Sequence, residues 1–145
     1  MMRRMGAGAA MAVALLLPRV SAVAAPATTA HSPLPALFTA RDAAQGKIVF
    51  AQHCAACHGA DLRGKIGPAV IGPVLGSAAN HTTVSIMFNV IAAEMPEGDP
   101  ASLTNADYAA VMAYLLQQNG YPAGTRPLTF SAAETSDVPL ISQVR

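Results

Sequence analysis

Apolar residues recur at three- and four-residue intervals in three stretches of the chain, which is the spacing of an amphipathic α-helix. This spacing predicts helices over about residues 39–54, 82–94 and 104–119. Each stretch opens with a threonine suited to an N-cap, and in the first of them Thr39 precedes Asp42 by three residues, as in a capping box. The sequence therefore predicts an all-α domain built on three main helices.

The apolar face of each predicted helix indicates which residues are buried. They are Ala43, Gly46 and Phe50 in the first, Val84, Met87, Phe88 and Ile91 in the second, and Tyr108, Val111, Met112 and Leu115 in the third. Gly46 stands out, because glycine inside a helix costs about 1 kcal/mol relative to alanine. A glycine in such a place usually lets another backbone come close, so we expect a close approach there.

Glycine and proline shape the segments outside these helices. Residues 59–76 contain so many of both that a long helix or strand is excluded, and we expect a loop that wraps around something. Residues 25–38 are expected to form an extended arm. Residues 122–145 show no sustained period and are expected to form an irregular tail that is flexible or lies across the domain or a partner. The predicted folded domain is then residues 39–121.

The first 24 residues have the features of a signal peptide. Arg3 and Arg4 form a charged start, residues 6–17 are small or apolar throughout, and Ala-Val-Ala at residues 22–24 is a cleavage site. The apolar run is too short to span a bilayer unaided. An uncleaved anchor is the alternative, although a proline and an arginine follow the run. We therefore expect export to the periplasm and removal of residues 1–24.

The charge balance bears on the partners of the mature protein. Removal of the signal peptide takes away three arginines and changes the formal net charge at pH 7 from +1 to −2. Nucleic-acid binding needs a basic surface, so we expect no nucleic-acid partner. We expect contact with a membrane only through a partner or an uncleaved leader.

The strongest chemical signal is Cys54-Ala55-Ala56-Cys57-His58, the C-x-x-C-H pattern that attaches haem c. Each thiol can add across one vinyl group of a porphyrin, and His58 then becomes the proximal ligand of the iron. A structural zinc site needs about four ligands, and this chain has only two cysteines. A thioredoxin-like dithiol lies beside a strand and opens a helix, whereas these cysteines close one. The pattern therefore predicts one covalently attached haem c.

The second axial ligand of that iron decides between electron transfer and ligand chemistry. The candidates outside the leader are Met87, Met95, Met112, His53 and His81. Met87 and Met112 lie on apolar helix faces, where methionine commonly fills the core. Pro96 biases Met95 toward an extended backbone, which suits a thioether presented from a loop. Met95 is therefore favoured, with His81 next.

Over about residues 40–121 the chain resembles the class I cytochrome c family. Besides the C-x-x-C-H pattern, the shared features are Gly46-Lys47-Ile48-Val49-Phe50, Gly67-Pro68, Met95-Pro96 and Tyr114-Leu115. Residues 118–124 also look like the close of the last helix in haem domains that accompany periplasmic quinoprotein alcohol dehydrogenases. The chain departs from small soluble cytochromes in its tail and in having no tryptophan.

The resemblance implies a cytochrome c fold, in which helices and loops enclose one haem and Gly46 and Phe50 cross against the Tyr114 region. It also implies that the Pro68 carbonyl accepts a hydrogen bond from the His58 imidazole, which would fix the tautomer of the ring. The implied cofactor-binding residues are Cys54, Cys57, His58, Pro68 and Met95, with His58 and Met95 as the metal ligands.

The expected function is one-electron transfer without catalysis. The haem would cycle between Fe(III) and Fe(II), passing electrons from a dehydrogenase or reductase to an oxidase or another cytochrome. The expected partners are redox proteins, such as a quinoprotein dehydrogenase or a terminal oxidase. Two alternatives stay open. One is a peroxidase-like haem enzyme or gas sensor with an open or displaceable sixth site, and the other is a haem subunit of a larger dehydrogenase complex.

Overall fold

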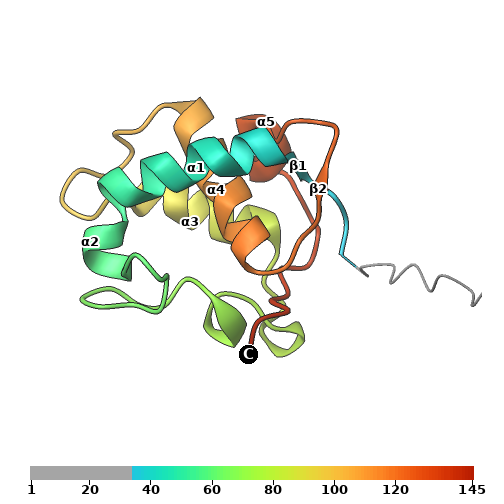
Figure 1. Ribbon diagram of the computed structural model, residues 1–145, viewed down its shortest axis with the longest axis horizontal. Coiled ribbons are helices and arrows are strands. Elements are labelled where there is room, and N and C mark those ends of the chain that lie inside the picture. The colour runs from blue at the N-terminus through green and yellow to red at the C-terminus, as the bar shows by residue number, and fades with distance from the viewer. Residues whose placement is uncertain (1–33) are drawn as a thin grey trace, which may run out of the picture. The chain divides into compact units, whose positions relative to one another are not determined.

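The computed structural model describes residues 34–145, and helices make up most of its regular structure. In chain order the elements are β1 (Phe38–Thr39), α1 (Ala40–His53), α2 (Ala55–His58), η1 (Gly72–Val74), η2 (Ala78–Asn80), α3 (Val84–Glu94), α4 (Asn105–Gln118), β2 (Ala123–Gly124) and α5 (Phe130–Glu134). The prediction of an all-α fold with three main helices is confirmed, and α1, α3 and α4 are those helices (Figure 1).

The N-terminal ends of the three main helices are set by threonine caps. Thr39 accepts a hydrogen bond from the Asp42 N–H, and the Asp42 carboxylate accepts one from the Thr39 N–H, which completes the predicted capping box. Thr83 and Thr104 are the N-cap residues of α3 and α4, and each side chain accepts a hydrogen bond from an N–H three residues further on. These bonds satisfy N–H groups that a helix start otherwise leaves without partners.

Helices α1 and α4 form the main helix–helix contact of the fold, and they cross at Gly46. A Cβ atom added to Gly46 would lie 1.8 Å from the carbonyl oxygen of Ala110 and 2.9 Å from Cβ of Tyr114. One turn further along α1, the rings of Phe50 and Tyr114 pack with their centroids 5.5 Å apart. The glycine that propensity disfavours therefore allows two helix backbones to touch.

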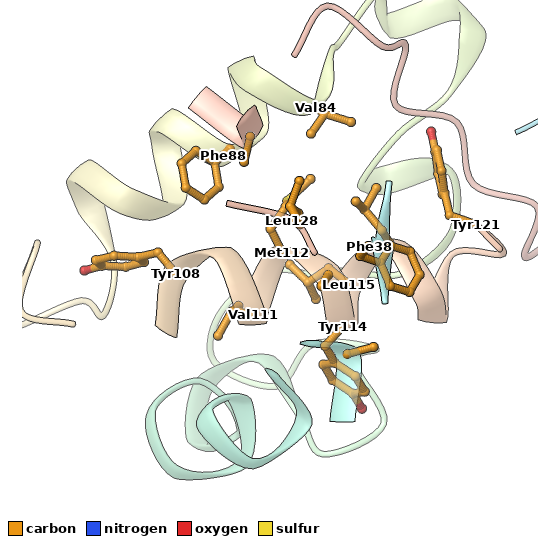
Figure 2. Close-up of a cluster of buried hydrophobic side chains, with 14 of the residues drawn as sticks. Phe38, Val84, Phe88, Tyr108, Val111, Met112, Tyr114, Leu115, Tyr121 and Leu128 are labelled. Atoms are coloured by element: carbon orange, nitrogen blue, oxygen red, sulfur yellow. The ribbon is translucent and has the colours of Figure 1, made fainter. Parts of the chain in front are cut away.

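Helix α4 lies at the centre of the core and is buried continuously from Tyr108 to Leu116. Figure 2 shows that the side chains of α4 are buried on more than one side of the helix. Val111 and Tyr114 point toward one side, while Met112 points toward the side of α3 that carries Val84 and Phe88. A helix that is covered on several sides needs apolar residues around most of its circumference.

The arm before α1 differs from its prediction, because its last residues belong to the core. Leu34 and Phe38 are both buried, and Phe38 is fully so. In β1, Phe38 pairs in parallel with Ala123 of β2, and Thr39 pairs with Gly124. The large apolar side chain of Phe38 gains more from burial than from an exposed extended arm. The arm therefore does not stay outside the folded domain.

The tail at residues 122–145 is also more ordered than predicted, because it contains β2 and α5 and contributes to the core. Leu128, Ala133 and Leu140 are buried, and the rings of Phe88 and Phe130 pack edge to face at 4.9 Å. The core is therefore not confined to residues 39–121. The tail lies across the domain, which is one of the arrangements that the sequence left open.

After α5 the tail runs as an extended strap, defined here as residues 136–144. Its backbone bonds three separate parts of the domain: Val84 N–H donates to Val138 O, Ser142 N–H to Gly76 O, and Gln143 N–H to Asn119 O. Figure 1 shows the strap, in red, ending beside the loop that carries η1 and η2. The strap thus ties α3, this loop and the end of α4 together.

Asn119, at the end of α4, is fully buried and fully hydrogen-bonded. Its amide oxygen accepts from the N–H of Gly72 at 2.9 Å, and its amide nitrogen donates to the carbonyls of Val70 at 3.3 Å and Leu115 at 2.8 Å. A buried amide whose partners are all backbone groups holds the loop in one position relative to the helix.

Replacing Asn119 with alanine is expected to lower the free energy of unfolding by about 2–3 kcal/mol, because the variant leaves the buried N–H of Gly72 and the partly buried carbonyl of Val70 without that partner. Chemical denaturation followed by circular dichroism measures the change. Asn105→Ala, at an exposed position in the same helix, is the control and should stay within about 0.5 kcal/mol of wild type. Equal losses in the two variants would contradict the role given to Asn119.

The predicted signal peptide, residues 1–24, and the arm up to residue 33 lie outside the described residues. Those expectations therefore stay predictions. Between residues 34 and 145, none of the helices has the length and apolar character that a membrane crossing would require.

Candidate functional site

One cavity of about 310 Å³ is lined by all five residues that were expected to bind the cofactor: Cys54, Cys57, His58, Pro68 and Met95. They come from the end of α1, from α2, from the loop that follows α2, and from the loop that follows α3. Most of the other lining side chains are apolar, and they include Phe50, Val70, Val74, Leu75, Met87, Val90, Ile91, Val111 and Leu115. The cavity is therefore apolar, with thiol, imidazole and thioether groups in its wall.

The C-x-x-C-H segment forms one helical turn that continues from α1 after a short break. Cys54 ends α1 with its N–H bonded to Phe50 O, and its own carbonyl accepts from the N–H groups of Cys57 and His58. Residues three positions apart on a helix lie on the same face, so this turn presents Cys54 and Cys57 together. Both cysteines are free and half-buried.

Burial sets the acidity of one of these thiols. Burial first, and the neighbouring Cys57 second, raise the pKa of Cys54 from 9.0 to about 11. Both causes disfavour the thiolate, one because a charge loses hydration and the other because like charges repel. Before any attachment the Cys54 side chain is therefore a neutral thiol at pH 7.

The His58 ring is held by the loop that follows α2. Its Nδ1 lies 2.8 Å from the carbonyl oxygen of Pro68, and since a carbonyl can only accept, Nδ1 carries the proton and donates. The N–H groups of Ile66 and Gly67 both bond to Cys57 O, which folds the loop back onto α2. In the neutral ring, a proton on Nδ1 leaves the lone pair of Nε2 free to bind a metal.

Gly67 allows that close approach of loop and ring. A Cβ atom at Gly67 would lie 3.1 Å from Cε1 and 3.3 Å from Nδ1 of His58. Any side chain there would crowd the imidazole on which the hydrogen bond to Pro68 depends. Gly67 and Pro68 together therefore hold the His58 ring in its orientation.

Met95 reaches the cavity from the C-terminal cap of α3. Its backbone is extended, with φ −114° and ψ 152°, which is the conformation expected for a residue before proline. Its N–H still bonds to Ile91 O, so the helix positions the residue even though it is not helical itself. The side chain is half-buried and lines the cavity.

The other candidates for an axial ligand fall into two groups. Met87 and His53 also line the cavity, whereas Met112 and His81 do not. Met112 is fully buried in the core between α4 and α3. His81 is exposed and ends η2 in a left-handed conformation with φ 50°. The structure thus brings three of the five candidates to the site.

Sequence reasoning missed Val74, Val90 and Glu97 as parts of this cavity. Val74 and Val90 are 65% and 42% exposed, so they line the cavity and reach the surface as well. Neither belongs to a motif with chemical meaning. Two exposed valines become informative only when the fold brings them beside the same cavity.

A larger groove of about 690 Å³ lies between α1, α4 and residues 128–130. Its lining includes Arg41, Asp42, Ile48 and Phe130, but no histidine, cysteine or methionine. Size alone therefore does not identify the cofactor site. The donor groups select the smaller cavity, because its lining includes two thiols, two imidazoles and two thioethers beside apolar walls, and these are the kinds of group that attach and ligate a haem c.

Two comparisons with known proteins find similarity to this chain. No curated protein matches the chain. A chain in the crystal structure of the sulfane dehydrogenase SoxCD from Paracoccus pantotrophus is similar, with 24% sequence identity and a TM-score of 0.51 over 70% of this chain. The similarity covers 53% of that chain, about half its length, and shows a shared fold.

The family comparison is more specific. Residues 41–115 match the family described as cytochrome c oxidase, cbb3-type, subunit III. The match runs from α1 into α4, covers more than half of the chain, and includes the C-x-x-C-H segment and Met95. The protein therefore belongs to this family and is a class I c-type cytochrome.

Proposed function

We propose that this protein is a one-electron carrier in which haem c is attached through Cys54 and Cys57 and ligated by His58 and Met95. The observation that carries the proposal is that His58 and Met95, from separate elements, line the same apolar cavity as both cysteines. Membership of a c-type cytochrome family supports it. When bound, haem c supplies a reversible one-electron couple at its iron.

His58 and Met95 are the residues that would hold the iron of haem c. His58 donates a hydrogen bond from Nδ1 to Pro68 O, which fixes the orientation of the ring. The bond also makes the Nε2 lone pair more basic and so a stronger metal ligand. Met95 offers a neutral, soft sulfur, which favours the reduced state of a metal more than a second imidazole does. Two strong protein ligands would leave no position on the iron for a substrate, so the site would favour electron transfer over bond chemistry.

The walls of the cavity keep water away from the redox centre. Phe50, Val111 and Leu115 are each at most 3% exposed and close the cavity from α1 and α4. Burial limits how far the surroundings must reorganise when the charge of the centre changes by one unit. An apolar, tightly packed interior is therefore consistent with repeated electron transfer in both directions.

Electrons would enter and leave where the cavity reaches the surface. Val74 and Val90 are exposed there, and Glu97 is the one carboxylate among the lining residues. We place the contact with redox partners on this rim and on the exposed Ala56, which lies between Cys54 and Cys57 in the chain. Such contacts are small and short-lived in electron-transfer encounters.

The proposed setting is the periplasm, with a dehydrogenase or reductase as donor and an oxidase or another cytochrome as acceptor. The signal peptide expected at residues 1–24 supports the location. The family is described as a subunit of an oxidase, which supports an oxidase as the electron acceptor. A quinoprotein dehydrogenase remains a candidate donor from the resemblance of residues 118–124.

The competing function is ligand chemistry at an open sixth site, as in a peroxidase or gas sensor. It predicts that Met95 leaves the axial position free. Variants of Met87 and Met95 form a matched pair for testing this alternative, because both methionines line the cavity.

Met95→Ala should open the sixth position, and we expect the affinity of the reduced holoprotein for carbon monoxide to rise at least about tenfold, or about 1.4 kcal/mol. Optical titration measures it. Met87→Ala is the matched control and should bind carbon monoxide as weakly as wild type. Strong binding of carbon monoxide by wild type would refute the carrier function. A rise in affinity in Met87→Ala alone would identify Met87, and not Met95, as the ligand.

A second candidate function is that of a haem subunit in a larger complex. The shared fold with a chain from a sulfane dehydrogenase structure favours it. Truncation of the tail is a poor test, because Leu128, Ala133 and Leu140 are part of the core. Size-exclusion chromatography of native extract, followed by haem absorbance, is cleaner. A free carrier elutes at the size of one chain, and a subunit elutes with its complex.

A further inference from the structure

The carbonyl of Met95 is held by a side chain from a different helix. The hydroxyl of Tyr108, in the first turn of α4, donates to Met95 O at 2.6 Å. Tyr108 is 3% exposed and Met95 is half-buried, so this bond is partly buried. Figure 2 shows the Tyr108 hydroxyl pointing away from the core cluster, toward the loop that joins α3 to α4.

The same hydroxyl also holds the other end of that loop. The N–H of Leu103 donates to the Tyr108 oxygen at 3.4 Å, and the N–H of Ala101 donates to Met95 O at 3.3 Å. Residues 95 and 103, which begin and end the loop, are therefore joined through one phenol. The last carbonyls of a helix lack partners within the helix, and here Tyr108 supplies one for the cap of α3.

We propose that Tyr108 is a positioning residue for Met95, fixing the backbone from which the thioether enters the cavity. The proposal rests on the proposed role of Met95 as an axial ligand. Methionine has three rotatable side-chain bonds, so a mobile backbone would add to the freedom that ligation has to remove. Anchoring the carbonyl removes part of that freedom before the sulfur binds.

The hydroxyl, rather than the ring, carries this role. The Tyr108 ring packs in the hydrophobic core, and phenylalanine would keep that packing. The hydroxyl adds nothing to the apolar contacts, yet it forms bonds to both ends of the loop. Tyr108→Phe therefore removes the anchor and retains the core.

Imidazole binding to the ferric holoprotein tests the proposal, because imidazole must displace the sixth ligand. We expect Tyr108→Phe to bind imidazole about 5- to 10-fold more tightly than wild type, a range that corresponds to the net free energy of one hydrogen bond. Met95→Ala should bind more tightly still. The charge-transfer absorption of a thioether–iron bond should weaken in Tyr108→Phe and vanish in Met95→Ala.

Tyr121→Phe is the matched control, because Tyr121 is also 3% exposed and its hydroxyl also joins two backbone groups. It donates to Pro139 O at 2.7 Å and accepts from Ile141 N–H at 2.9 Å, within the strap. Denaturation should show that both phenylalanine variants lose stability. Only Tyr108→Phe should change imidazole affinity.

The outcomes separate the two proposals. If Tyr108→Phe binds imidazole like wild type, or if Tyr121→Phe gains affinity equally, the positioning role is wrong while Met95 ligation stands. If Met95→Ala itself leaves imidazole affinity unchanged, Met95 is not the ligand, and both proposals are overturned.

Discussion

The Cys54→Ser/Cys57→Ser double variant is expected to carry no covalently bound haem at all. The chain has only these two cysteines, and both line the cavity beside His58. A serine hydroxyl does not form the thioether that a thiol forms with a porphyrin vinyl group. Mass spectrometry of the denatured protein, expressed in a host that matures c-type cytochromes, measures the loss as the full mass of one haem.

Two further variants separate attachment from ligation. Met95→Ala should keep its haem through denaturation, because it retains both thiols. His81→Ala, at an exposed histidine that does not line the cavity, should keep haem content and spectrum unchanged. Covalent haem in the double cysteine variant would refute the attachment site, since no other thiol is available.

Gly46→Ala is expected to be the most damaging single substitution in the helical core, lowering the free energy of unfolding by more than about 3 kcal/mol. The new Cβ would lie 1.8 Å from Ala110 O and 2.4 Å from Ala110 C, which are backbone atoms of α4 that no rotamer change can move. Helices α1 and α4 would have to separate. Because both line the cavity, haem content should fall as well.

Helix propensity alone would predict the opposite change in the stability of Gly46→Ala. In an isolated helix, alanine is more stable than glycine by about 1 kcal/mol. Lys47→Ala, at the exposed neighbouring position, introduces alanine into the same helix without touching the helix crossing and should change stability by no more than about 0.5 kcal/mol. Denaturant unfolding of the holoproteins measures both variants. A Gly46→Ala protein as stable as wild type would contradict the close helix crossing.

Much of the fold could be predicted because its signals are local. Thr39, Thr83 and Thr104 cap their helices through atoms within three residues, so the caps can be read from adjacent positions. The breaker-rich loop and the C-x-x-C-H turn are local in the same sense. The arm and the tail were underestimated, because Phe38 and Leu140 are buried by contacts with segments far away in the chain.

The same distinction applies to the candidate site. Cys54, Cys57 and His58 lie in one turn, and their spacing alone indicates their chemistry. The sequence interpretation of Tyr108 was limited to a buried position at the start of a helix. Its bond to Met95 O spans 13 residues and depends on how α3 and α4 pack, which no local pattern encodes.

A haem c, the three main helices and a short set of possible axial ligands could all be predicted from the sequence, because each prediction depends on residue type and short-range spacing. The packing of distant segments determines which candidates share a cavity: Met95, Met87 and His53 line it, and Met112 and His81 do not. It also determines that the tail completes the core. Burial and hydrogen bonding between distant segments depend on the packing of the whole chain, and that packing is what brings His58 and Met95 to one cavity.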